Sequence, residues 1–175
     1  KEYDVEFENN SELIYERKPQ RKFNTKNNIS FRPFIASREE FFKGAIMLQN
    51  NSEFIISDNF FFTTNLKYSL ADNFDDLTIP PKTTYPAQVR SDIKDYLKNI
   101  NRTLVIGRAQ FDYYKTLKKN NHIMLSGGIL EDMFSGYGLE YLYYDDEKNY
   151  GLGFEIFEAY KRDYEQRFGL LDYNS

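Results

Sequence analysis

The chain has 175 residues, a length that suits one domain and is short for two. Its 23 Lys and Arg against 27 Asp and Glu give a net charge of −4, which argues against nucleic acid as the main partner because phosphate binding needs a basic face. The absence of cysteine and the single His122 exclude disulfide scaffolds, cysteine-ligated zinc, cysteine nucleophiles and any site that needs two imidazoles.

The first part of the chain alternates between apolar and polar residues, which is typical of strands with two different faces. Pro33 lies within one such run and indicates an edge or bulged position. The polar run Asn50, Asn51 and Ser52 predicts a turn. The candidate strands in this part are 3–8, 12–18, 28–37, 41–50 and 60–69.

A long connection at 72–100 separates two groups of strands and contains the single predicted helix, at 86–99. Pro86 suits the first turn of a helix. The apolar residues that follow have helical spacing, namely Val89, Ile93, Tyr96 and Leu97. Arg90, Asp92 and Asp95 lie on or near this helix, which is either a solvated connector or a cap at the periplasmic mouth of a barrel.

The second strand group shows the clearest alternation, over 104–113, 122–132, 136–144 and 150–160. In the first of these runs, Val105 and Phe111 share one face, opposite Arg108, Gln110 and Asp112. Short polar connections follow, such as 115–121 and 145–149. We therefore predict an all-β fold with an antiparallel meander.

Two architectures fit this alternation: a soluble β-sandwich or barrel with the apolar face inward, and a transmembrane barrel with that face toward lipid. The later strands span about 10 to 12 residues, which suits a tilted membrane crossing. Charges on the polar face are either solvated surface residues or the lining of a wet lumen. The candidate lumen residues are Arg108, Gln110, Asp112, Glu140 and Glu155.

Two other polar clusters could form a catalytic, metal or sugar-binding site, but each is more simply explained as a group of solvated surface residues. Glu131 and Asp132 precede Glu140 on the next strand, so three carboxylates could form a glycosidase pair or a calcium site. Acids at strand ends are more often solvated, so we expect no catalysis, no metal and no cofactor. The mixed-charge run at 161–168 either contacts sugar or forms an exposed extension.

Several long segments, in order and spacing, resemble the YjbH-like family of bacterial outer-membrane β-barrel (lipo)proteins. They are ISFRPF at 29–34, LADNFDD at 70–76, VRSDIKDYL at 89–97, QFDYY at 110–114, GGILEDMFSGYGLEYLY at 127–143 and YKRDYEQRFGLLDY at 160–173. The sequence departs from the expected pattern at Leu139, which separates Gly138 from Glu140, and at Tyr144 and Asp145, where a basic residue and a proline are expected.

The resemblance implies a bacterial outer-membrane protein with a part in exopolysaccharide or capsule production or secretion, and no enzymatic reaction. Its implied partners are an exopolysaccharide chain, outer-membrane lipid and other envelope proteins of the exopolysaccharide operon. Family members are much longer than this chain, which begins at Lys1, so we interpret 1–175 as a single barrel fragment. The alternatives are a carbohydrate-binding or surface-anchoring β module without transport, and a soluble β enzyme with a carboxylate pair.

Overall fold

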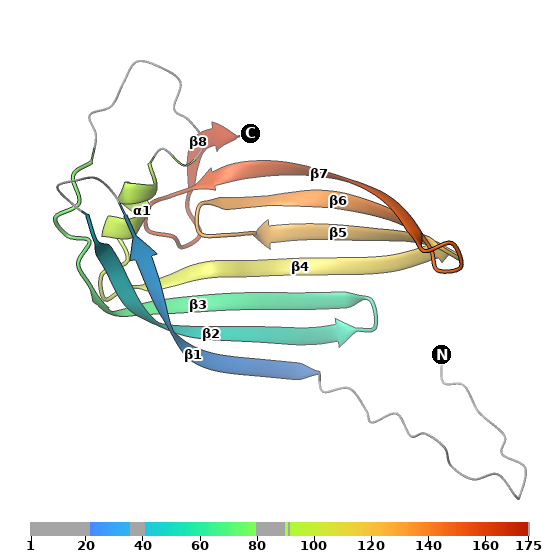
Figure 1. The fold of residues 1–175 in the computed structure, drawn as a ribbon, viewed down its shortest axis with the longest axis horizontal. Helices are drawn as coiled ribbons and strands as arrows, with labels where there is room; N and C mark the ends of the chain where they lie inside the picture. The colour runs from blue at the N-terminus through green and yellow to red at the C-terminus, as the bar shows by residue number, and fades with distance from the viewer. Residues whose placement is uncertain (1–21, 36–40, 80–89, 91, 175) are drawn as a thin grey trace, which may run out of the picture.

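The computed structural model describes residues 22–35, 41–79, 90 and 92–174. These form one eight-stranded antiparallel sheet in which each strand pairs with its neighbours in chain order (Figure 1). The predicted all-β meander is confirmed. The strands are β1 (Phe23–Phe34), β2 (Lys43–Ser57), β3 (Phe60–Asp72), β4 (Leu104–Lys118), β5 (Asn121–Ile129), β6 (Phe134–Asp145), β7 (Tyr150–Arg162) and β8 (Leu170–Asn174).

The sheet is open over the described residues, with β1 and β8 at its two edges. β8 is short, and its register with β7 spans only the end of that strand, from Tyr160 to Arg162. The candidate strands 3–8 and 12–18 lie outside the described residues. The assignment of 1–175 to a single barrel fragment stays a prediction.

β2 is longer than the sequence predicts, and the turn expected at Asn50, Asn51 and Ser52 is wrong. The strand runs through these residues, and the turn to β3 falls at Asp58 and Asn59. Side-chain amides pair across the strands here: Asn51 Nδ2 donates to Asn28 Oδ1 at 3.1 Å, and Asn65 Nδ2 donates to Asn51 Oδ1 at 2.6 Å. This cross-strand pairing outweighs the local turn preference of asparagine.

The predicted helix is present in a shorter form, α1 (Ile93–Lys98). Arg90 has a φ of 65°, a left-handed conformation that a continuous α-helix does not contain, so the helix begins after it. Residues 86–89 lie outside the described residues. No helix in the described part of the chain combines the length and the apolar character needed to cross a membrane.

The two faces of the sheet differ in chemistry, and the cross-strand register assigns each side chain to one of them. We call the face that carries α1 the inner face and the opposite one the outer face. Register partners on the inner face include Asn65 with Arg108 and Glu140 with Glu155. The outer face carries large apolar side chains, with Phe111 45%, Leu125 45%, Phe154 60% and Ile156 65% exposed.

The buried core lies at one end of the inner face, between the sheet and α1. Its main cluster consists of Ala45, Met47, Phe74, Leu77, Leu97, Ile100 and Val105. A second cluster joins Tyr96 of the helix to Met133 and Phe134 at the start of β6. The apolar core therefore occupies the α1 end, and the charged side chains of the inner face lie along its remaining length beside residues such as Met124 and Leu142.

Val105 corrects one face assignment made from the sequence. We predicted it on the same face as Phe111, but it lies in the core beneath α1, and Phe111 lies on the outer face. The register of β3 and β4 moves from Asn65↔Arg108 to Leu66↔Ile106, so Gly107 is an extra residue in a β-bulge. A bulge inverts the alternation on one side of it, and period-two counting alone does not reveal it.

Candidate functional site

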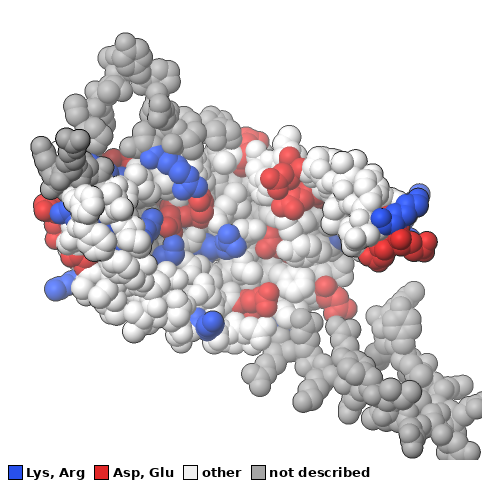
Figure 2. All heavy atoms as spheres, viewed as in Figure 1, with Lys and Arg blue, Asp and Glu red and all other residues white. Residues whose placement is uncertain are grey.

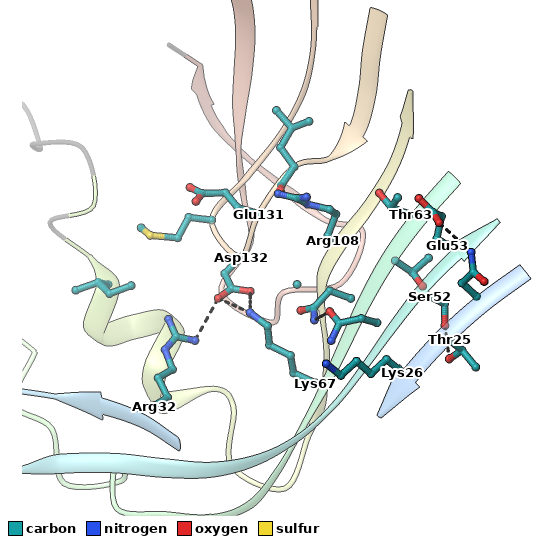
Figure 3. Close-up of a pocket in the computed structure, with 18 of the residues that line it drawn as sticks. Thr25, Lys26, Arg32, Ser52, Glu53, Thr63, Lys67, Arg108, Glu131 and Asp132 are labelled. Carbon is teal, nitrogen blue, oxygen red and sulfur yellow. Dashed lines mark hydrogen bonds and ion pairs between the residues drawn. The ribbon is translucent and has the colours of Figure 1, made fainter. Parts of the chain in front are cut away.

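A polar cavity of about 610 Å³ lies on the inner face, beside α1 (Figure 3). Its walls come from β1, β2, β3, β4, the start of α1 with the nearby Arg90, and the connection between β5 and β6. Eight of the side chains that line it are charged: Lys26, Arg32, Glu53, Lys67, Arg90, Arg108, Glu131 and Asp132. Six sequence segments therefore meet at this cavity.

Asp132, in the β5–β6 connection, is the central anion of the cavity. It accepts hydrogen bonds from Lys67 Nζ at 2.7 and 3.0 Å and from Arg32 Nη1 at 3.2 Å. Arg32 belongs to β1, four strands away in the sheet, so the sheet must curl for this contact to form (Figure 3). The Asp132 and Lys67 side chains are each only 17% exposed, which weakens solvent screening of the pair.

Arg108, one of the predicted lumen residues, lines the same cavity. Its Nε donates to the Leu130 carbonyl at 3.2 Å, which orients the guanidinium at the cavity wall. Neutral polar side chains lie beside it, including Thr63, Asn51 and Asn65. Amide and hydroxyl groups that both donate and accept hydrogen bonds suit a ligand rich in hydroxyl groups.

The other predicted lumen residues lie on the same inner face, farther from α1. Gln110 Nε2 donates to Asp112 Oδ1 at 2.7 Å, and the Asp112 side chain is buried. Glu140 and Glu155 face each other across β6 and β7 and line a second cavity of about 510 Å³. The structure thus places all five candidates on one face but divides them between two regions.

The carboxylate trio considered in the sequence does not gather. Glu131 pairs with Arg90 at 2.6 Å, Asp132 pairs with Lys67, and Glu140 lies opposite Glu155. Among the described residues, no group of three His, Cys, Asp or Glu side chains is arranged to hold a metal ion. These acids therefore belong to ion pairs and to the second cavity.

Arg162 does not line the cavity but holds the backbone of two residues that do, Glu131 and Asp132. Its guanidinium is completely buried and donates to four backbone carbonyls, those of Ile106, Glu131, Asp132 and Arg167, at 2.7 to 3.1 Å. The Tyr96 hydroxyl donates in turn to the Arg162 carbonyl, and burial raises the pKa of Tyr96 above its usual value. Arg162 thereby fixes the backbone that carries Asp132.

The structure divides the run at 161–168, for which we weighed sugar contact against an exposed extension. Lys161, Arg162 and Gln166 are buried and act as an internal anchor, whereas Glu165, Arg167 and Phe168 are exposed. Sequence reasoning also missed Lys67 as a site residue. Its period-two spacing from Thr63 and Asn65 placed it on the polar face and could have identified it.

Comparison of the sequence with known proteins identifies a family. A family model described as "Exopolysaccharide biosynthesis protein YbjH" matches residues 2–175. The chain is also 24% identical over 141 residues to the "Uncharacterized lipoprotein YjbH" of Escherichia coli (strain K12), an alignment that covers 79% of this chain. The alignment covers 20% of the length of that relative. No solved structure matches.

Proposed function

Because the chain belongs to the YjbH family of exopolysaccharide biosynthesis proteins, we propose that it forms part of an outer-membrane β-barrel whose inner face contacts exopolysaccharide during production or secretion. The role is to bind or pass the glycan without a chemical step. The relative named as a lipoprotein supports a place in the cell envelope. Outer-membrane lipid and other envelope proteins of exopolysaccharide production are the further partners of this proposal.

The observation that carries the proposal is the inverted polarity of the sheet. Large apolar side chains such as Phe154 and Ile156 are mostly exposed on the outer face, whereas the inner face holds Arg108, Asp112 and Glu140. Exposing a large apolar side chain to water forgoes about 1.5–3 kcal/mol of burial free energy, a loss that lipid contact removes. Strands β4, β6 and β7 have 15, 12 and 13 residues, enough to cross a bilayer at a tilt.

The proposal is tested by the amount of polymer that cells release. Replacing Arg108, Gln110 and Asp112 together by alanine, in the protein as the cell makes it, is expected to lower extracellular polysaccharide while the protein level in the membrane is unchanged. Alanine at Lys119 and Glu147, one cation and one anion at exposed positions of the β4–β5 and β6–β7 turns, is the charge-matched control. Wild-type polymer output from the inner-face variant contradicts the proposal.

A carbohydrate-binding module without transport is the second candidate. The position of α1 over one end of the inner face favours it, since a helix there suits a groove better than a channel. Titrating a glycan into the purified protein, beside a liposome-swelling assay, separates the two candidates. Binding without swelling supports the module, and swelling supports the conduit.

A further inference from the structure

Resting on this proposed function, we propose that the cavity beside α1 selects an anionic glycan, one that carries carboxylates on its sugars. The proposal concerns the charge class of the glycan, which the family description leaves open. It depends on the charges that line the cavity, on the donors that Arg108 presents and on where the acidic residues of the inner face lie.

The cavity is electropositive in a chain whose net charge is −4. Five cationic side chains line it, against three carboxylates. Asp132 is shared by two of the cations, Lys67 and Arg32, and both are largely withdrawn from solvent, at 17% and 29% exposed. Because screening is weaker there than at an open surface, the excess positive charge attracts an anion into the cavity.

Arg108 provides the group best suited to a sugar carboxylate. Within the described residues its one hydrogen bond runs from Nε to a backbone carbonyl, and its terminal nitrogens have no carboxylate partner. Guanidinium matches a carboxylate with two parallel charge-assisted hydrogen bonds. Thr63 and Asn65 beside it can bond to sugar hydroxyls, so one sugar residue can meet both kinds of group.

The acids of the inner face restrict such a glycan to the α1 end. Asp112, Glu140 and Glu155 follow the cavity along the strands, away from α1. Figure 2 shows Lys and Arg side chains near α1, with acidic side chains among them, and acidic side chains along the middle of the strands. An anionic chain is therefore bound more strongly at the α1 end of the inner face than beyond it.

The test compares oligogalacturonate with a neutral maltooligosaccharide of the same length, titrated into the purified protein at low salt. We expect the anionic oligomer to bind at least about tenfold more tightly, because a charge-assisted pair contributes about that much. Arg108→Gln should weaken its binding by a similar factor. Lys119→Gln, the same charge change at an exposed turn, should have no effect.

A second variant is expected to raise the affinity, which separates an effect on binding from a loss of folding. Asp132→Asn releases Lys67 and Arg32 from their shared carboxylate, so oligogalacturonate should bind more tightly, a gain that misfolding cannot produce. Equal affinity for the two oligomers, no binding of either, or unchanged affinity in Arg108→Gln overturns the inference. Each of these leaves the proposed barrel function standing, because that function fails by different results: wild-type polymer output from the Arg108, Gln110 and Asp112 variant, or aqueous exposure of the outer face in lipid vesicles.

Discussion

At the scale of single residues, the structure depends on side chains whose role is set by the backbone around them. Arg162 is the clearest case, because an arginine in a charged run normally stays in water. Here its donors satisfy carbonyls of β4, of the β5–β6 connection and of the segment after β7. The sequence could not indicate this, since the carbonyls come from segments up to 56 residues away.

Replacing Arg162 tests this anchor. Arg162→Gln leaves several buried carbonyls without a donor, so the free energy of unfolding should fall by about 3 kcal/mol or more. Arg102→Gln, at an exposed position before β4, should change it by less than about 0.5 kcal/mol. Urea unfolding of both variants in detergent measures the difference, and equal stability of the two would contradict the anchoring role.

Adjacent glycines in β5 provide a second test at this scale. Gly128 has a φ of 128°, and a Cβ there would lie 2.3 Å from the Ala109 carbonyl oxygen. At Gly127 the nearest atom to an added Cβ is 3.7 Å away, an ordinary contact. Gly128→Ala should therefore cost about 1–3 kcal/mol of stability, and Gly127→Ala much less. A thermal unfolding comparison that reversed this order would refute the backbone geometry.

At the scale of elements, strand periodicity predicted β4 to β7 well because each has one apolar and one polar face. It failed where local preference and tertiary pairing disagree, as in β2, where asparagines expected to turn instead pair across strands. It also failed at Val105, where one bulged residue inverts the alternation. α1 was predicted too long because the positive φ of Arg90 is not visible in apolar spacing.

The packing around α1 predicts a pH dependence. Tyr164 stacks edge-on against Tyr96 with ring centroids 5.0 Å apart, and burial, with the charge of Asp92, raises the pKa of Tyr164 to about 12. Between pH 10 and 12 the unfolded chain ionises this tyrosine while the folded chain does not. Stability should therefore decline as pH rises through that window.

Tyr164→Phe should reduce the loss of stability between pH 10 and 12. The pH dependence that remains should come from Tyr96, whose pKa is also raised. The measurement is the free energy of unfolding at a series of alkaline pH values for the two proteins. Superimposable pH profiles would show that Tyr164 does not titrate abnormally.

β7 offers neighbouring residues that separate its two faces. Phe154 lies on the outer face and Glu155 on the inner face, opposite Glu140. Phe154→Arg should cost about 2–4 kcal/mol of membrane-folded stability if this position meets hydrocarbon near the midplane. Glu155→Arg should be tolerated. The fraction of protein folded into lipid vesicles reports both, and equal tolerance of the two changes would argue against a lipid-facing Phe154.

At the scale of the whole molecule, the sequence predicted the meander and the polar face, but not which residues meet across the curled sheet. Arg32 and Asp132 are 100 residues apart, and their contact requires the sheet to curve and the β5–β6 connection to lie over it. The alternation of apolar and polar residues predicts which face of the sheet a side chain occupies, but it does not predict how the sheet curves. This is why the five predicted lumen residues fall on one face while the centre of the cavity, Asp132 with Lys67, emerged only from the structure.

The orientation of the two faces in lipid is measured most directly with single cysteines, because the chain has none of its own. Fluorophores are placed at outer-face Leu125 and Phe154 and at inner-face Met124 and Glu155, in protein reconstituted in vesicles, with unsubstituted protein as the blank. Nitroxide lipids should quench the outer pair, and aqueous iodide the inner pair. Iodide quenching of the outer pair, or lipid quenching of the inner pair, would contradict the proposed membrane barrel.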